Sequence, residues 1–324
     1  MKFVPGLIVA VVLAALAYAP KVLLPNLTIS PLLTVILLGM AIASLMQLPA
    51  TWKPGLQLAQ KPILRWGVAG LGFKLSLQEL ASIGGSALVV VVVSTVAALA
   101  FGWWLGRRVG LPDKMNLLLG VGGGICGASA IVAADTVVQG EQSDSALPLG
   151  IITLVGTVGI VVYPLLGQAL HLSPFVYGVW NGASLHEMAQ VIAAGNAIPD
   201  AISPSTVTKL ARICLLAPVV FYLGWMLRKK QQNVGEAKVP LVPWFLVVFV
   251  LLAAFRTLVE VPKPTAKLVE DLDLFILCVG MAGVGLFSDF RQIVRAGVKP
   301  ILVGVGQWVF LAALALALTL IFCK

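Results

Sequence analysis

The chain has 324 residues, of which 60% are hydrophobic and only 11% are charged, and its mean hydropathy is +1.02. An average globular protein carries about 25% charged residues, and a soluble domain of this size cannot hide so much apolar surface. Because one spanning helix needs about 20 apolar residues, the composition predicts an all-α polytopic membrane protein. It excludes a disordered chain, a secreted disulfide scaffold and a soluble enzyme with one membrane anchor.

The net charge of +9 does not point to a nucleic-acid partner. The basic residues stand singly or in pairs between apolar runs, a pattern that sets membrane orientation. The cysteines lie inside apolar stretches without a CxxC pair, which is typical of small buried residues and not of disulfides or metal ligands. We therefore expect no nucleic acid, no metal and no cofactor. The cysteines are Cys126, Cys214, Cys278 and Cys323.

Apolar runs between Pro, Gly and charged residues predict about eleven transmembrane helices. The first run ends in a motif similar to a signal-peptidase site, but Pro20 after that motif favours a retained span. Short loops predict one transporter domain over residues 1–324: an extra N-terminal helix (1–28), a first repeat (29–170) and a second repeat (171–324). The predicted spans are residues 5–24, 30–47, 60–76, 82–106, 114–138, 145–169, 173–195, 204–228, 240–258, 269–288 and 297–323.

The lysines and arginines of alternate loops predict the orientation of the chain. Thirteen of them fall on one side and eight on the other, when Arg65 is left out as intramembrane. The positive-inside rule then places the N-terminus in the cytoplasm and, with an odd number of spans, the C-terminus outside.

An internal repeat indicates a transporter. The segment from Gly67 to Gly72 reads GVAGLG, and the segment from Gly280 to Gly285 reads GMAGVG, at a constant shift of 213 residues. The two segments lie in spans of opposite direction, as in the inverted repeats of secondary transporters. Small-residue helix packing is the alternative interpretation. We expect two inverted units of five helices after the extra first helix.

A second repeated sequence does not fit this arrangement of two inverted units. The sequence Gly-Ala-Ser occurs at residues 127–129 in span five and again at residues 182–184 in span seven. These two spans have the same parity, so the two copies should run in parallel.

Span five carries a glycine-rich segment at residues 120–129. Glycine costs about 1 kcal/mol in a helix interior, and lipid supplies no replacement hydrogen bonds. The segment therefore predicts a broken helix that lines a polar cavity, with a new half-helix starting near Gly127. The N–H groups of such a start, beside Cys126 and Ser129, would attract an anion. Close packing against a crossing helix is the alternative, and both can hold together.

Span seven places ionisable residues in the membrane. Continued as one helix, it would bring Gly182, His186 and Gln190 onto one face, with Glu187 beside them. Buried His and Glu in a span usually move protons or ions, although a structural hydrogen bond between helices would also explain them. The stretch is similar to the zinc motif His-Glu-x-x-His, but Gln190 is a poor zinc ligand. We expect that the protein is not an enzyme.

Lys209 and Arg212 lie three residues apart in span eight and share a helical face. They could serve as a counter-charge for an anion or for Glu187. Snorkelling of both side chains to the membrane interface is the alternative.

Three stretches make the chain similar to a known family. They are GVAGLGFKLSL at residues 67–77, GGGICGASAIVA at residues 122–133 and NGASLHEMAQVIAAG at residues 181–195. The whole chain resembles the bacterial sulfate exporter family, which is similar in fold to transporters of the bile-acid:sodium symporter type. The resemblance implies a bacterial inner-membrane location, a panel domain, a core domain and two crossing broken helices at the substrate site.

The resemblance and the residues together define a candidate site and function. We expect a secondary active transporter, an exporter, of a small anion such as sulfate or an organosulfur anion, coupled to protons. The alternatives are an ion-coupled carrier of a small organic anion, with sodium as the other coupling ion, and a passive anion channel. A homodimer would suit an exposed helical panel. The predicted site comprises Gly122, Gly123, Gly124, Cys126, Gly127, Ser129, Asn181, Ser184 and Gln190 for the substrate, His186 and Glu187 for proton coupling, and Lys209 and Arg212 as counter-charges.

Overall fold

The computed structural model describes residues 2–19, 31–74, 77–138, 145–231, 244–287 and 297–323, and every regular element in these ranges is a helix. Two compact units are formed by segments that interleave along the sequence. Within the described ranges, four helices are long and apolar enough to cross a membrane, and three shorter apolar helices accompany them. The four are Gly84–Val109, Ala146–Ala169, Ile202–Met226 and Lys299–Phe322, and the shorter ones are Val4–Leu16, Thr34–Leu45 and Val247–Leu258. The predicted total of eleven spans stays a prediction.

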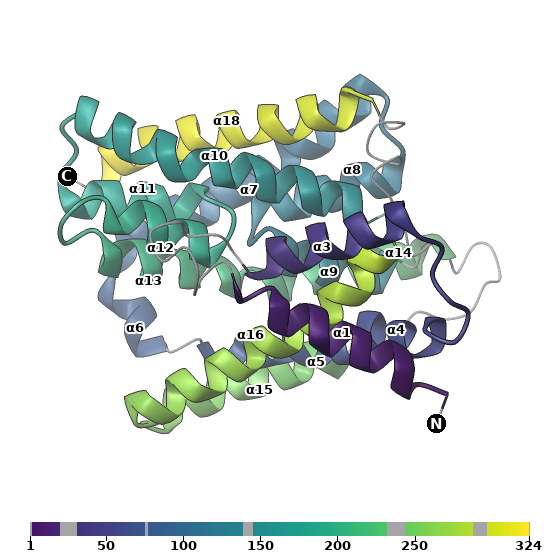
Figure 1. Ribbon diagram of the computed structural model, residues 1–324. Coiled ribbons are helices and arrows are strands. Elements are labelled where there is room, and N and C mark those ends of the chain that lie inside the picture. The colour runs from purple at the N-terminus through teal and green to yellow at the C-terminus, as the bar shows by residue number, and fades with distance from the viewer. Residues whose placement is uncertain are drawn as a thin grey trace. The chain divides into compact units, whose positions relative to one another are not determined.

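Unit 1 comprises residues 1–76, 135–147 and 224–297. Its long helix α16 packs against α1, α3 and α5, and α15 packs against α5 (Figure 1). Pro62 lies inside η1, a wider π-helical turn, because proline removes one hydrogen bond of a regular helix and its ring needs room. The elements of unit 1 are α1 (Val4–Leu16), α3 (Pro31–Leu45), α4 (Lys53–Leu58), η1 (Ala59–Ile63), α5 (Leu64–Gly70), η2 (Leu71–Lys74), α15 (Trp244–Leu258) and α16 (Lys263–Leu286).

Contacts between α5 and α16 are reciprocal under the 213-residue shift. A methyl group on Gly67 would meet the side chain of Leu277 at 2.7 Å, and one on Gly280 would meet the side chain of Leu64 at 2.5 Å. Adding 213 to 64 and 67 gives 277 and 280, so each contact is the counterpart of the other. Helix α3 ends at Leu45 and helix α15 at Leu258, positions that the same 213-residue shift relates. The glycines that the repeat contains therefore permit close helix packing.

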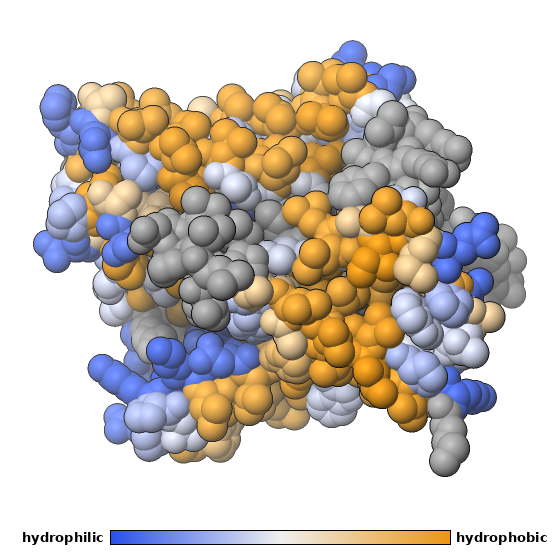
Figure 2. All heavy atoms as spheres, in the orientation of Figure 1, coloured by the Kyte–Doolittle hydropathy of each residue, from blue (hydrophilic) through white to orange (hydrophobic). Residues whose placement is uncertain are grey.

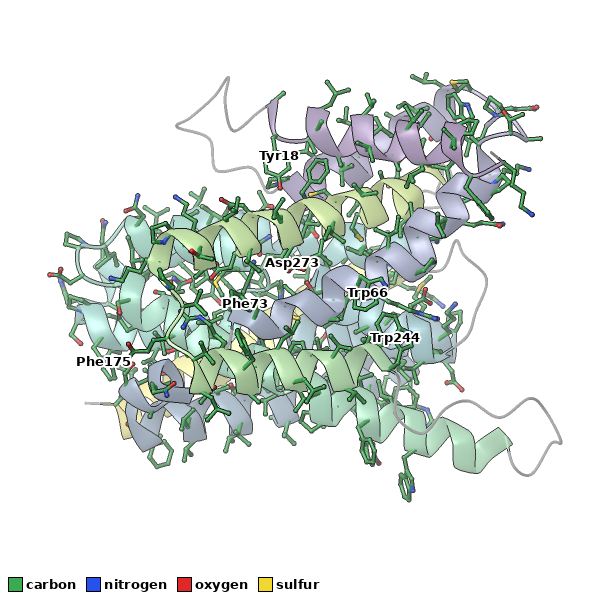
Figure 3. The ribbon with its side chains drawn as sticks, turned by 90° about the horizontal axis from the view of Figure 1, so that it is seen from below. Tyr18, Trp66, Phe73, Phe175, Trp244 and Asp273 are labelled. Carbon is green, nitrogen blue, oxygen red and sulfur yellow. The ribbon has the colours of Figure 1, made fainter. Side chains whose placement is uncertain are left out.

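The same shift relates a polar residue to an acidic one. Gly70 packs against the carboxylate of Asp273, while its counterpart Gly283 packs against Gln60. Asp273 is 6% exposed, and its Oδ2 atom has no hydrogen-bond partner in the described part of the chain. Figure 3 shows Asp273 on α16, and it also shows Trp66 of α5 beside Trp244 of α15, whose ring centroids lie 4.6 Å apart. A buried carboxylate thus replaces an amide at one of two related positions.

Unit 2 comprises residues 77–134, 148–223 and 298–324. Helix α7 packs along α18, where the rings of Phe101 and Phe310 stack at 4.1 Å, and α11 packs against α13. Helices α9 and α10 each have a few residues that belong to unit 1, and α14 belongs to it from Gly224 onward. The elements are α6 (Leu77–Ser82), α7 (Gly84–Val109), α8 (Asp113–Gly124), α9 (Ala128–Val138), α10 (Ala146–Ala169), α11 (Pro174–Ser184), α12 (Met188–Asn196), α13 (Ile202–Cys214), α14 (Leu216–Gln231) and α18 (Lys299–Phe322).

The outer side chains of unit 2 are apolar. Leu154 and Val161 of α10 are each 63% exposed, and Leu302 of α18 is 57% exposed. Figure 2 shows apolar residues over the part of the surface where α10 and α18 lie. An apolar patch of this extent is unfavourable in water, so these helix faces suit lipid.

Candidate functional site

The first feature of the site is a break in span five. Helix α8 ends at Gly124 and α9 begins at Ala128, and the residues between them do not continue the helix. Gly127 has a φ of 69°, a left-handed conformation that costs other residues about 1–2 kcal/mol. The break predicted from the glycine-rich segment is therefore confirmed, with a new half-helix directly after Gly127.

A second break interrupts span seven. Helix α11 ends at Ser184, Leu185 and Glu187 are extended, and α12 begins at Met188. The expectation that Gly182, His186 and Gln190 share one face of a continuous helix is wrong, because this break separates them. A sequence signal for it exists: Glu187 and Gln190 form a capping box, in which each side chain bonds the other residue's backbone N–H.

Lys209 of α13 joins the two breaks. Its Nζ atom donates hydrogen bonds to the carbonyl oxygen of Ile125 at 3.0 Å and to that of Leu185 at 2.7 Å. Both carbonyls lie at the C-terminal end of a half-helix, where the helix dipole favours a cation. Lys209 is 0% exposed, so the alternative of snorkelling to the interface does not describe it.

Arg212 makes a parallel set of bonds one helical turn further along α13. Its Nε donates to the oxygen of Gly124 at 2.9 Å, its Nη1 to that of Leu185 at 2.8 Å and its Nη2 to that of Gly123 at 2.6 Å. It is also 0% exposed. We name the first break (residues 125–127), the second break (residues 185–187), Lys209 and Arg212 together the paired break. All of its members belong to unit 2.

Glu187 lies where the two downstream half-helices begin. Its Oε1 accepts a hydrogen bond from Thr153 of α10 at 2.8 Å, and its side chain caps α12. A methyl group on Gly127 would meet Cγ of Glu187 at 3.1 Å, so the carboxylate side chain also stands beside the start of α9. Gln190 completes this arrangement by donating to the carbonyl oxygen of Thr153 at 3.1 Å. Its amide nitrogen and oxygen are thus both engaged in hydrogen bonds, the oxygen accepting from the backbone N–H of Glu187 at 3.0 Å.

His186 is fully buried between these groups. Lys209 and Arg212 are close enough for their charges to act on its ring. Neither ring nitrogen makes a well-formed hydrogen bond within the described residues. A buried imidazole without a firm partner is costly, so the position is compatible with a ligand or a proton that the ring would contact.

The glycines predicted for the substrate have packing roles. A methyl group on Gly122 would meet Ile131, one on Gly123 would meet Gln307, and one on Gly124 would meet Leu99. The alternative of close packing is thus supported alongside the helix break. In the same segment, Cys126 is 6% exposed and Ser129 is half-buried near the start of α9.

Asn181 and Ser184 hold α11 in place. Asn181 donates to the carbonyl oxygen of Val191 at 2.9 Å and to the hydroxyl of Ser205 at 3.0 Å. Ser184 donates to the carbonyl of Trp180 and accepts from the hydroxyl of Tyr163 at 2.8 Å. These bonds tie α11 to its neighbours, and their part in substrate binding stays a prediction.

Two polar residues near the paired break, Thr153 and Gln307, were not predicted from the sequence. Thr153 anchors both Glu187 and Gln190, and nothing in its apolar surroundings marks it. Gln307 of α18 donates to the carbonyl oxygens of Ala98 and Gly120 at 3.0 Å and 2.8 Å, which fixes α8 just before its end. Gln307 did carry a signal, since a lone buried amide in an apolar span needs a partner.

The site lies in helices of membrane-spanning character. Thr153 belongs to the apolar helix Ala146–Ala169, and Lys209 and Arg212 belong to Ile202–Met226. Buried ionisable groups in such helices are costly and usually functional. The fold and the site together define a helical, multi-pass membrane protein with two adjacent interrupted helices.

Comparison with known proteins then places the chain in a family. The family described as Conserved hypothetical protein 698 matches residues 5–304, and the chain belongs to it. A UPF0324 membrane protein of Yersinia pestis is 33% identical over 326 residues, covering 96% of this chain and 90% of its own. The UPF0324 inner membrane protein YeiH of Salmonella typhi is 32% identical, with coverage of 95% and 91%. UPF0324 membrane protein PA5383 of Pseudomonas aeruginosa is 34% identical, with coverage of 98% and 95%. These relatives support a multi-pass inner-membrane location.

Proposed function

We propose that the protein is a secondary active transporter, working as an exporter, of a small anion such as sulfate or an organosulfur anion, coupled to protons. One observation carries the proposal: two buried cations, Lys209 and Arg212, join two adjacent helix breaks. Interrupted helices at a substrate site are a feature of secondary transporters, because their ends offer charge and hydrogen bonds inside the membrane.

The repeat supports the same proposal. In this proposal the inverted repeats are related by the 213-residue shift. The division into repeats 29–170 and 171–324, which the loop lengths predict, is not used for this relation. The reciprocal contacts of Gly67 and Gly280 support the shift. In this proposal the N-terminus is cytoplasmic, the C-terminus is outside and the transporter assembles as a homodimer.

The proton-coupling groups are Glu187 and His186. Both are buried at the paired break, with exposed fractions of 5% and 0%, where a change of protonation alters the charge of the site. A group of this kind can link the binding of an anion to that of a proton without any cofactor.

Sulfate counterflow in proteoliposomes, with and without a pH gradient, tests the proposal. We expect uptake above that of empty liposomes, accelerated by the gradient and lost in Arg212→Gln. Lys267→Gln, which removes an exposed lysine of unit 1, is the matched control and should keep full uptake. Uptake without counterflow or response to the gradient would indicate a passive channel. No uptake of sulfate, sulfonates or small carboxylates by folded protein would refute the proposal.

A further inference from the structure

Within the described residues, no hydrogen bond joins either cation of the paired break to a carboxylate. In the part of the chain that the structure describes, all hydrogen bonds of Lys209 and Arg212 go to backbone carbonyl oxygens. Carbonyl oxygens carry only partial charges. We take both side chains as protonated, because they donate to carbonyl oxygens at the C-terminal ends of half-helices, where a cation is favoured. Their hydrogen-bond partners then leave the two positive charges without a neutralising charge.

Lys209 and Arg212 also have more N–H donors than the hydrogen bonds they make. An ammonium group has three N–H bonds and a guanidinium group has five. Lys209 uses two of its three, and Arg212 uses three of its five, within the described residues. Three N–H groups thus remain without an acceptor at a site that is closed to solvent, which is a costly state. An anion that accepts hydrogen bonds would satisfy them.

Among the described residues, Glu187 supplies a carboxylate beside this region. It is held by Thr153 on α10, stands beside Gly127 at the start of α9 and interacts with Lys209 on α13 through space. Cys126 in the first break interacts electrostatically with Glu187, Lys209 and Arg212, Tyr163 on α10 interacts with Arg212, and His186 lies next to Glu187 in the chain. Because Lys209 and Arg212 act electrostatically on His186, a third positive charge on its ring would be repelled by them. Glu187 is therefore the group that we assign to the proton.

Charge neutrality then determines which anions fit. With Glu187 ionised, the side chains of Lys209, Arg212 and Glu187 sum to one positive charge, and with Glu187 protonated they sum to two. A site closed to water is most stable when its charges cancel. We propose that the paired break takes a monovalent anion when Glu187 is ionised and a divalent anion when Glu187 is protonated. A dianion such as sulfate would then be carried together with one proton.

This inference rests on the proposed anion site. It adds a charge rule: the charge of the bound anion is set by whether Glu187 is ionised or protonated. The test measures Kd by titration calorimetry on the purified full-length protein across the pH range from acidic to slightly alkaline. The probes are sulfate, which stays a dianion over that range, and methanesulfonate, which stays a monoanion. Above the pH at which Glu187 loses its proton, we expect the Kd of sulfate to rise about tenfold per pH unit. The Kd of methanesulfonate should change less than about twofold, because its binding needs no proton on Glu187.

A substitution of Glu187 tests whether this residue carries the proton. Glu187→Gln keeps an oxygen that can accept from Thr153 and cap α12, so it should fold, and its sulfate affinity should be tight and independent of pH. Asp200→Asn is the matched control, since Asp200 is exposed and has a φ of 64°, which asparagine tolerates. It should keep the wild-type pH dependence.

The remaining outcomes separate the inference from the proposed function. Parallel pH dependence for both anions, or pH-dependent sulfate binding in Glu187→Gln, would overturn the charge rule while the anion site stands. Loss of the pH dependence in His186→Asn but not in Glu187→Gln would assign the proton to His186 and overturn the rule as stated. Binding of neither anion to folded protein would overturn the proposed function itself.

Discussion

The Nζ atom of Lys209 lies 2.7 Å from the carbonyl oxygen of Leu185, at the C-terminal end of α11. The same atom reaches Ile125 just after α8, so one buried ammonium group joins two helix ends that are distant in the sequence. Each interrupted helix leaves unpaired carbonyl groups at its break, and in lipid no water would pair them. Lys209 and Arg212 supply the missing donors, which explains how two helices can be broken inside one unit.

Removing either cation should destabilise the protein, and Arg212 should matter more. Arg212→Gln loses three hydrogen bonds to carbonyl oxygens and Lys209→Gln loses two. The carbonyl of Leu185 keeps one donor in either variant, so Arg212→Gln deprives two carbonyls of their side-chain donor and Lys209→Gln deprives one. Each carbonyl left without a donor costs about 1–3 kcal/mol. Thermal unfolding in detergent should show a larger fall in Tm for Arg212→Gln than for Lys209→Gln. An unchanged Tm in both variants would show that the carbonyl groups do not depend on these donors.

Thr153→Val should weaken the position of Glu187. The change keeps the shape of the side chain but removes the hydroxyl that donates to Oε1 of Glu187. A hydrogen bond to a charged group contributes about 1.5–3 kcal/mol, so both Tm and the rate of pH-driven transport should fall. Thr157→Val is the matched control, because its hydroxyl bonds only the preceding helical turn at the carbonyl of Thr153. Equal effects of the two changes would argue against a specific role for Thr153.

Gly127→Ala should strain the first break. Alanine in the left-handed region costs about 1–2 kcal/mol, and its methyl group would lie 3.1 Å from Cγ of Glu187. We expect a lower Tm and weaker anion binding. Gly150→Ala, where a methyl group would meet nothing within 4 Å, should leave both unchanged or raise Tm slightly. Normal binding by Gly127→Ala would place the anion elsewhere.

The reciprocal contacts of unit 1 predict paired effects. Gly67→Ala and Gly280→Ala each force a methyl group against a leucine of the partner helix, and overpacking of this kind costs about 1–3 kcal/mol. The two variants should lower Tm by similar amounts. Gly85→Ala, in α7 and without a neighbour within 4 Å, should be neutral or stabilising. A fall in Tm for only one of the two glycines would mean that the two contacts are not equivalent.

The sequence predicted the membrane class and the break at Gly127. It did so because glycine and ionisable residues are costly in an apolar helix, so their presence is informative. The second break was not predicted from residues alone: Leu185 and His186 carry no helix-breaking signal, and the capping pair of Glu187 and Gln190, which indicates a helix start, was not used. The partners of Lys209 and Arg212 could not be predicted either. They are backbone carbonyl groups, which every residue has, so only the folded structure shows which of them lie next to the two side chains.

Protection of Cys126 from a thiol reagent tests whether the anion binds at the paired break. Cys126 lies in the first break and is 6% exposed, while Cys323 is 4% exposed at the end of α18 and serves as a control of equal burial. Variants that retain only one of these cysteines would be treated with a small neutral methanethiosulfonate, with and without a saturating transported anion. We predict that the anion slows the modification of Cys126 several-fold and leaves that of Cys323 unchanged. Modification of Cys126 at the same rate in the presence of an anion that the protein transports would contradict the placement of the site.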